Sequence, residues 1–304
     1  MNGHTLSLAW ILPFLGILLS IALCPLFMPR FWHRHFGKVS VFWLTTCVGA
    51  MVWTQGIPVA VHEILHTYII HFLPFIILIG TLYILSAHIK LTIKGTATPT
   101  FNTVFLGIAC LCANFLGTVG AAMIFIKPFL SVNEHRVHKT HSMVFFIFLV
   151  CNIGGCLTAI GDPPLFLGFL NGVEFFWPLK TVYLPFSIMV LSLLTVYWMI
   201  DFYYARQEKI LIHAPFHVSL KGLFHIILLM MAILLIIFSG FYQELGSFSF
   251  LGLTLKQVDI CRDVGLCSMA YLSYWKGKKE GSEPLNKEPL IEVMYLFAGI
   301  FMTA

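Results

Sequence analysis

The chain has 304 residues, of which 59% are hydrophobic and 10% are charged, and its mean hydropathy is +0.90. A soluble domain carries about 25% charged residues, so this composition excludes an ordinary soluble enzyme and indicates an integral membrane protein. The net charge of +5 does not indicate nucleic-acid binding, because the basic residues stand in short clusters between apolar runs. The eight cysteines form no CxxC pair, so we expect neither a disulfide framework nor a zinc ribbon.

Apolar runs predict membrane-spanning helices, which we take in chain order. The first three runs cover 8–28, 40–60 and 72–90, and residues 8–39 combine the first helix with a basic loop. No Lys or Arg precedes the first run, and the run is long enough to span a bilayer. We therefore expect a retained helix there rather than a signal peptide.

The next apolar block, 101–130, has the sequence NFLGTVG (114–120) at its middle. Each of its two arms is shorter than the roughly 20 residues that a membrane crossing needs. This pattern predicts a re-entrant hairpin that turns at mid-depth, with a single kinked helix as the alternative.

An interrupted helix is predicted over 142–170, because its middle, Asn152–Phe166, reads NIGGCLTAIGDPPLF. This segment contains three glycines, two adjacent prolines and an aspartate, which disfavour a continuous helix. Backbone groups freed in hydrocarbon would each cost several kcal/mol. Broken backbone at membrane depth is tolerated where it lines a cavity, and transporters place their binding sites there.

Further spans are predicted at 181–204 and 222–242. A weaker helix at 262–275, inside a hydrophilic linker over 243–290, either spans or lies in the interface. The last apolar run ends the chain within 291–304. All of these segments are expected to form one transmembrane domain, 1–304.

Charge sorting supports the hairpin. Five basic clusters fall on one side of the membrane only if 101–130 returns to the side that it entered, which makes that side cytoplasmic and places the N-terminus outside. The clusters are Arg30/Arg34/Lys38, Lys90/Lys94, Arg136/Lys139, Arg206/Lys209 and Lys276/Lys278/Lys279.

Two segments carry a family resemblance: 113–130, ANFLGTVGAAMIFIKPFL, and 144–177, which ends GDPPLFLGFLNGVEFFW. They resemble the ion transporter superfamily, and in particular a bacterial group labelled sodium/proton antiporter or citrate transporter. The resemblance extends to 33–38 and 288–301. It implies an all-α polytopic fold in the bacterial inner membrane, with two inverted repeats. Each repeat supplies one re-entrant hairpin and one interrupted helix, and 40–242 would be the first.

Site residues are carried over by position. The implied ion- or substrate-binding residues are Asn114, Gly117 and Thr118 at the hairpin tip and Asn152, Gly154, Gly155, Thr158, Gly161, Asp162 and Pro163 at the broken helix.

The chain departs from the family pattern in several places. Ala113 and Cys151 stand where Ser is usual, and Ala159 replaces a Pro, which leaves the substrate open. The segment 291–304 would hold only the start of the second repeat. We therefore expect half of a split transporter or a truncated relic, whose partner would be a separately encoded C-terminal half or a second copy.

Asp162 is the residue that bears most on the substrate. An ionised carboxylate at depth is costly unless a cation or a proton compensates it. One group that binds either ion in turn is the minimum for antiport, so the sequence favours Na⁺/H⁺ exchange, with Na⁺ held by Asp162, Asn152 and Asn114. The alternative is citrate or dicarboxylate uptake coupled to Na⁺ or H⁺, and a third possibility is a non-transporting membrane fragment. No cofactor is expected.

Simpler structural roles compete at these positions. Asp162 suits a helix N-cap before Pro163. Asn114 suits a tight turn, and the hydroxyls of Thr118 and Thr158 suit bonds to their own helices.

Residues 62–66, HEILH, match the zinc metalloprotease pattern HExxH. On a helix His62 and His66 would share a face, and Glu63 would activate a metal-bound water. A third ligand is needed, for which His71 and Asp162 are the candidates. We expect the motif to lie in an outer loop, so an intramembrane protease is a remote alternative.

Overall fold

The computed structural model describes residues 10–208, 217–242, 246–250, 252–282 and 284–304. Leu8, Ala9 and Lys209, which belong to the predicted spans and basic clusters, lie outside these residues. The described part is mostly helical, and five of its helices are long and apolar enough to cross a membrane. The chain is therefore a polytopic membrane protein. These helices are Pro29–Gln55, Ile57–Ala87, Pro99–Leu116, Trp177–Gln207 and Leu223–Phe241.

The chain divides into two compact units. The first contains Met1–Ile77, Phe248–Leu255 and Asn286–Ala304, and the second contains Leu78–Ser247 and Lys256–Leu285. The C-terminal helix belongs to the first unit because it packs with the first two helices of the chain.

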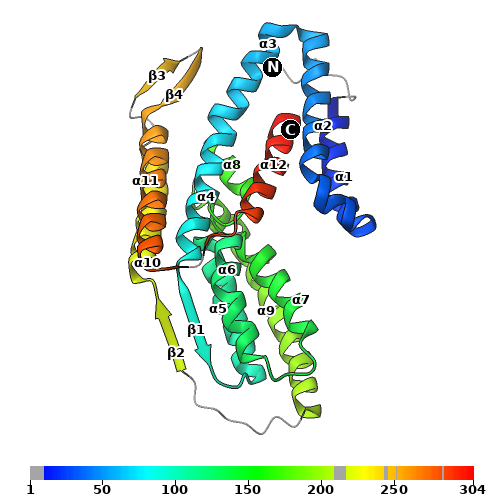
Figure 1. The fold of residues 1–304 in the computed structure, drawn as a ribbon, viewed down its shortest axis with the longest axis vertical. Helices are drawn as coiled ribbons and strands as arrows, with labels where there is room; N and C mark the ends of the chain where they lie inside the picture. Colours follow the sequence, from blue (N-terminus) through cyan, green and yellow to red (C-terminus); the bar gives the residue numbers. More distant parts are fainter. Residues whose placement is uncertain (1–9, 209–216, 243–245, 251, 283) are drawn as a thin grey trace. The chain divides into compact units, whose positions relative to one another are not determined.

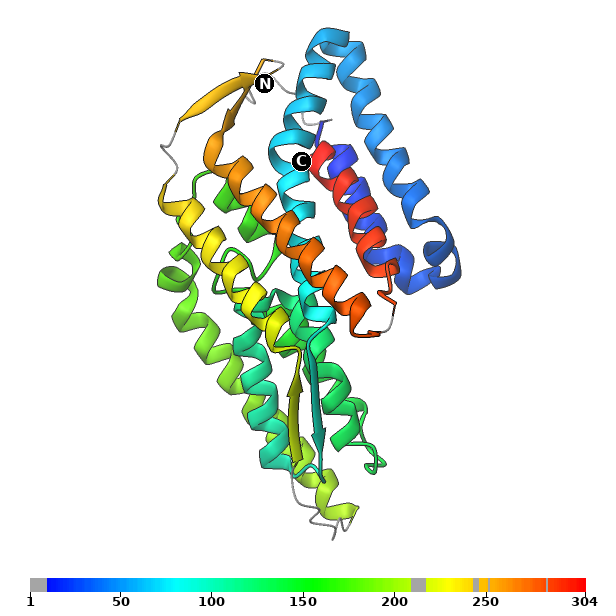
Figure 2. The same cartoon turned by 60° about the vertical axis from the view of Figure 1, so that its left-hand side comes forward.

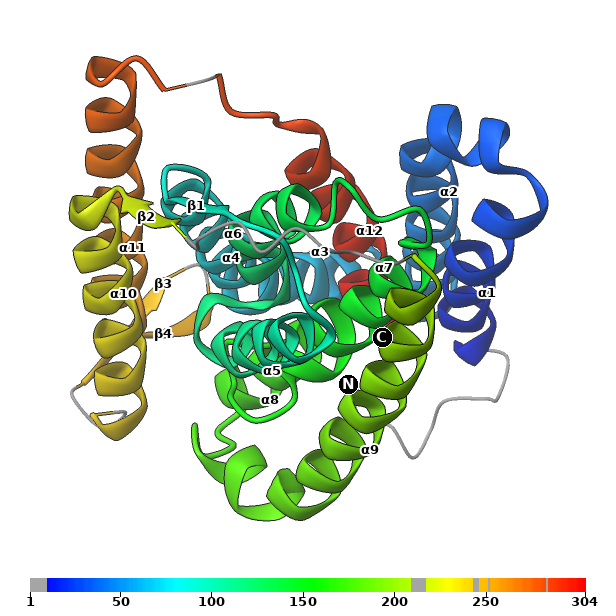
Figure 3. The same cartoon turned by 90° about the horizontal axis from the view of Figure 1, so that it is seen from below.

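The first unit is a helical cluster with α1 and α2 side by side (Figures 1 and 3). Trp43 Nε1 of α2 donates to Ser20 Oγ of α1 at 3.0 Å, and Ser40 Oγ of α2 donates to the Tyr295 carbonyl of α12. Gly299 of α12 permits this packing, because a Cβ there would lie 2.4 Å from Ser40 Oγ. The elements are α1 (Ile11–Phe27), α2 (Pro29–Gln55), α3 (Ile57–His66), a π-helical turn (Thr67–Phe72), the first residues of α4 (Leu73–Ala87) and α12 (Glu288–Thr303).

Two loops expected in this region are helical. Pro29 occupies the first helical position of α2, and the basic residues that follow it form the first turns of that helix. The HEILH motif lies within α3, which begins after Gly56, a residue with φ +86°. Polar and charged side chains interrupt an apolar run without interrupting a helix, which is why the sequence suggested loops.

The second unit holds a helix hairpin, an interrupted helix and three long helices. Its elements are the rest of α4, β1 (Lys90–Lys94), α5 (Pro99–Leu116), α6 (Thr118–Val132), α7 (Thr140–Phe146), a π-helical turn (Ile147–Asn152), a 3₁₀ turn (Ile153–Gly155), α8 (Pro163–Leu170), α9 (Trp177–Gln207), β2 (His217–Lys221), α10 (Leu223–Phe241) and α11 (Gln257–Lys279). The weak helix expected at 262–275 is longer than predicted.

Within this unit α5, α6, α7 and α9 pack as one group, whereas α10 and α11 run side by side (Figures 1 and 2). β1 and β2 pair antiparallel. β3 (Ser247–Phe250) and β4 (Leu253–Lys256), most of whose residues belong to the first unit, form a second two-stranded sheet.

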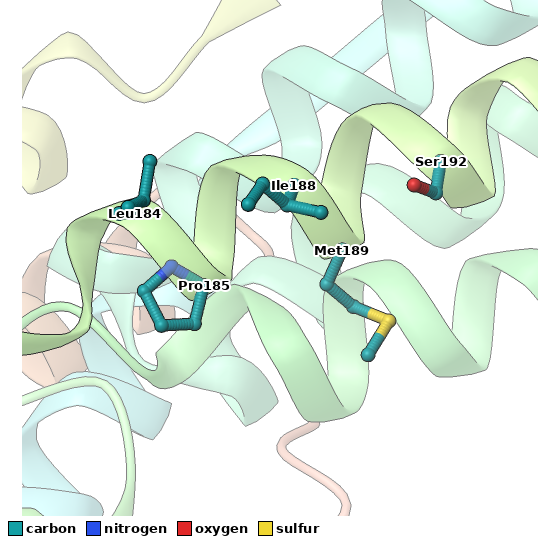
Figure 4. A pocket seen from close by; sticks show the side chains of 5 residues that line it. All are labelled: Leu184, Pro185, Ile188, Met189 and Ser192. Carbon is teal, nitrogen blue, oxygen red and sulfur yellow. The ribbon is translucent and has the colours of Figure 1, made fainter.

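The outer surface of α9 is apolar and exposed. A hollow of about 420 Å³ lies around Pro185, and Leu184 and Ile188 in its wall are 66% and 59% exposed (Figure 4). Exposed aliphatic side chains on a 31-residue helix suit contact with acyl chains.

Candidate functional site

The hairpin turns at a single glycine. Thr98 caps α5 by accepting a bond from the Phe101 N–H at 3.2 Å, and Pro99 occupies the first helical turn. Gly117 then ends α5 and begins α6 with φ +71° and ψ 154°, a conformation that residues with a Cβ rarely adopt. The turn therefore lies where the sequence placed the hairpin tip.

The helix that follows the hairpin is interrupted. After α7 it widens into a π-helical turn, continues as the 3₁₀ turn Ile153–Gly155 and then unwinds until α8 begins at Pro163. Pro163 and Pro164 supply no N–H donors, so a helix can begin at these residues but cannot run through them unbroken. The segment 156–162 is consequently a non-helical connection between two helical pieces.

The hairpin tip and the unwound segment are held together by hydrogen bonds. The Leu157 N–H donates to Asn114 Oδ1 at 2.8 Å, and the Thr158 hydroxyl donates to the Asn114 carbonyl. On the other side of the turn, the Thr118 N–H donates to the Gly161 carbonyl at 3.3 Å. Backbone N–H and C=O groups that lie away from water need hydrogen-bond partners. These bonds supply partners for groups that neither helix can satisfy.

Glycines allow the close approach that these bonds need. A Cβ on Gly154 would lie 2.8 Å from the Ala113 Cβ, so the 3₁₀ turn packs directly on α5. A Cβ on Gly161 would lie 2.0 Å from the Gly155 carbonyl oxygen, so the unwound segment closes on itself at these two residues.

Asp162 lies at the point where this closure ends. It is the N-cap residue of α8 with φ −133° and ψ 144°, but its side chain makes no capping bond. The carboxylate lies instead against Gly155, where a Cβ would be 2.6 Å from Asp162 Oδ1. It is half-buried, and within the described residues no hydrogen bond or ion pair occupies it. It is therefore an acceptor with capacity for a ligand.

The other predicted residues differ in their placement. Asn152 is exposed, and its amide donates to the Ile147 carbonyl at 3.0 Å, five residues back in the π-helical turn. The Asn114 amide is 2% exposed, and its oxygen is occupied by the Leu157 N–H. Asn114 and Thr158 thus connect the hairpin to the unwound segment, and Asn114 Nδ2 also donates to the Cys110 and Leu111 carbonyls of its own helix at 3.4 and 3.3 Å.

The HExxH motif lies on a helix, and its two histidine rings are parallel, with centroids 6.3 Å apart. His71 approaches His66 with a ring separation of 5.4 Å. Across the described ranges, no group of three His, Cys, Asp or Glu side chains is arranged to hold a metal ion.

A buried polar network that sequence reasoning missed lies at the open end of the hairpin. Asp201 of α9 is 0% exposed; its Oδ1 is 2.7 Å from Arg136 Nη2 and 2.9 Å from His141 Nε2. Its Oδ2 accepts a bond from Asn102 Nδ2 at 3.1 Å. Asn102 of α5 and Asn133 beyond α6 exchange amide bonds of 2.8 and 2.9 Å. The network therefore joins the two open ends of the hairpin to α9.

Comparison with known proteins identifies a family. The profile of a family described as putative citrate transport matches residues 3–304. No curated protein and no solved structure matches the chain.

Proposed function

The chain belongs to the putative citrate transport family, and from this premise we propose that it moves an organic anion of the citrate class across the membrane, coupled to a cation bound at Asp162. The observation that carries the proposal is the half-buried, unpaired Asp162 carboxylate, which lies in unwound backbone against the hairpin tip. Interrupted helices of this kind bind substrates and coupling ions in transporters.

A carboxylate at the site repels an anionic substrate unless a cation lies between them. A hard cation such as Na⁺ prefers carboxylate and carbonyl oxygens, and the unwound segment offers both. Cation binding neutralises the charge on Asp162 and supplies a cation that a substrate carboxylate can coordinate. We therefore place the cation first and the organic anion second.

The remaining site residues position this acceptor. Asn114 and Thr158 fix the unwound segment on the hairpin, and Gly155 and Gly161 bring the backbone against the carboxylate. Gly117, Thr118, Asn152, Gly154 and Pro163 complete the proposed site as the residues of the turn and of the two helix ends. Asn152 reaches the ion in this proposal only if it releases its bond to Ile147.

We further propose that the hairpin returns to the side of the membrane that it enters. α5 has 18 residues and α6 has 15, which corresponds to about 27 and 22 Å of helix against a hydrocarbon core of about 30 Å, so α5 is at the lower limit of a membrane crossing and α6 is below it. The Asn102–Asn133 bonds hold the two open ends together. Lys94 and Lys139 then flank the hairpin on one side, as positive-inside sorting requires.

The test is uptake of labelled citrate into proteoliposomes that contain the full chain, with an inward Na⁺ gradient. We expect uptake above that of empty vesicles, and a loss of more than about tenfold in Asp162→Asn. Glu134→Gln is the matched control, because Glu134 is an exposed carboxylate in the loop after α6. Undiminished uptake in Asp162→Asn contradicts the assignment of the coupling residue.

A measurement of ligand binding distinguishes a variant that binds its ligands but does not transport them from a variant that no longer binds them. A ligand at about 100 times its Kd stabilises the folded state by about 2.7 kcal/mol. We expect Na⁺ with citrate to raise the thermal unfolding midpoint of the purified chain, and we expect Asp162→Asn to remove this shift but Glu134→Gln to keep it.

Na⁺/H⁺ exchange is the second candidate, and the same carboxylate favours it, since one unpaired group can bind either ion in turn. Na⁺-driven proton flux is measured in proteoliposomes without organic anion. Flux that disappears in Asp162→Asn assigns antiport, whereas flux that requires citrate assigns the coupled uptake proposed above.

A further inference from the structure

The antiparallel ribbon formed by β1 and β2 has two chemically different faces. Its register pairs Lys90 with Lys221, Thr92 with Ser219 and Lys94 with His217, and these six residues share one face. The alternate pairs are Leu91 with Leu220 and Ile93 with Val218, and they share the other. The ribbon is therefore amphipathic along its whole length.

The polar face is basic and open. All six of its side chains are exposed, and none of the six is an Asp or a Glu. No carboxylate of the described residues forms an ion pair with Lys90, Lys94 or Lys221. Like charges directly opposite each other destabilise a two-stranded ribbon, and here Lys90 faces Lys221 at one end. An anionic partner on this face converts that repulsion into attraction.

The apolar face is only half covered. Ile93 is 5% exposed, and β1 lies against α6. Val218 and Leu220 on β2 remain 65% and 57% exposed. The apolar surface thus continues from the packed strand β1 to the exposed strand β2, and the basic face lies directly behind it. Such a surface suits the boundary between acyl chains and headgroups.

The position of the ribbon in the chain fits this boundary. Two residues separate the candidate span Ile57–Ala87 from β1, and one residue separates β2 from the candidate span Leu223–Phe241. Because β1 and β2 pair with each other, the span ends that they adjoin lie close together (Figures 1 and 2), and we place both ends at one side of the membrane.

We propose that this ribbon is a binding surface for anionic phospholipids. Lys90, Lys94 and Lys221 contact the headgroup phosphates, and Val218 and Leu220 enter the adjoining acyl region. Each lysine near an anionic bilayer surface strengthens the attraction roughly fivefold. The bound lipids lie on the exposed faces of the strands, because β1 is packed against α6 on its other side.

The experiment uses the full chain reconstituted in phosphatidylcholine with small amounts of spin-labelled lipid. Electron paramagnetic resonance gives the association constant of phosphatidylglycerol relative to phosphatidylcholine at the protein surface. We expect a preference of at least roughly fivefold for phosphatidylglycerol in the wild type. The preference falls towards unity in about 0.5 M NaCl, where the screening length is roughly 4 Å.

The variant Lys90→Gln/Lys94→Gln/Lys221→Gln removes the basic face, and we expect it to lose most of the preference. Its matched control is Lys276→Gln/Lys278→Gln/Lys279→Gln. That control removes three lysines at the end of α11, where Lys276 and Lys279 already lie over the Phe224 and Trp275 rings at 4.1 and 3.6 Å.

Three results of the spin-label comparison overturn the proposal: a wild-type protein without lipid preference, a ribbon variant that keeps the preference, and a control variant that loses as much of it. Displacement of phosphatidylglycerol by millimolar inorganic phosphate also overturns it, because the face would then bind soluble anions. The wild-type salt titration does not depend on variants that fail to fold. Since no step involves Asp162, the outcome is independent of the transport assays.

Discussion

Replacing Arg136 by Met tests whether the buried network at the hairpin base stabilises the fold. Asp201 is fully buried and shares its Oδ1 between Arg136 and His141. Removing the guanidinium leaves this carboxylate with His141 and the Asn102 amide alone. It also removes the 2.8 Å bond from Arg136 Nε to Glu208, whose side chain is 7% exposed.

The expected loss follows from the asymmetry of buried charge pairs. Removing one partner of such a pair costs about 3–5 kcal/mol, because the other charge stays buried without compensation. Replacing both partners by apolar groups costs much less. We therefore expect Arg136→Met to lower the unfolding free energy by about 3–5 kcal/mol, and Arg136→Met/Asp201→Leu to recover at least half of that loss.

Unfolding is followed by circular dichroism in detergent micelles, with denaturant titration of the wild type, both single variants and the double variant. Lys139→Met serves as the control, because Lys139 is an exposed basic residue three positions away. If Arg136→Met unfolds at the wild-type midpoint, or if the losses of the two single variants simply add, the network is not the coupled structure that its geometry indicates.

Two further variants test how the unwound segment is held, one where it closes on itself and one where it contacts the hairpin tip. Gly161→Ala places a Cβ 2.0 Å from the Gly155 carbonyl oxygen and is expected to destabilise the protein by about 3 kcal/mol. Gly80→Ala is the control, because nothing lies within 4 Å of its Cβ, and it is expected to be neutral or slightly stabilising. Equal unfolding midpoints of the two variants would refute the close approach. Thr158→Val removes the hydroxyl that donates to the Asn114 carbonyl and is expected to lower the unfolding free energy by about 1–3 kcal/mol. Thr158→Ser keeps the donor and is expected to keep most of the stability. Thermal unfolding distinguishes the two variants, and equal midpoints would argue against the bond.

Local chemistry explains why the hairpin tip and the interrupted helix were predictable. Gly117 must adopt a positive φ, and Pro163 with Pro164 must break a helix, whatever surrounds them. Signals of this kind depend on the residues themselves. The sequence also indicated that Asp162 is important, but it suggested a capping bond as the simpler role, and the side chain does not make one.

Partners distant in the chain were not predictable. The residues around Asp201 come from positions 102, 133, 136 and 141, and nothing in their spacing indicates that they meet. Arg136 was interpreted as one member of a basic cluster in a loop, yet it is 4% exposed. Burial of a charged group depends on its partners, which a single sequence does not identify.

The ribbon is a different case, because its signal was present. The segments KLTIK and HVSLK alternate polar and apolar residues with a period of two, as strands do. Lys90 and Lys94 were interpreted only as a basic cluster after the third apolar run, and the segment HVSLK was not interpreted at all. Their pairing joins residues more than 120 positions apart, so only the structure reveals the shared faces.

The same pairing has a mechanical consequence. The chain enters the group formed by α5 to α9 through β1 and leaves it through β2, and the two strands are hydrogen-bonded to each other. The proposed ion site is therefore carried on a loop of polypeptide whose two ends are paired in a double-stranded stem, and α8 of this loop also packs on α11, where Arg262 lies over the Phe166 ring at 5.9 Å. A displacement of that loop must bend both strands together, so a covalent crosslink across the stem would stiffen the tether without touching any residue of the site.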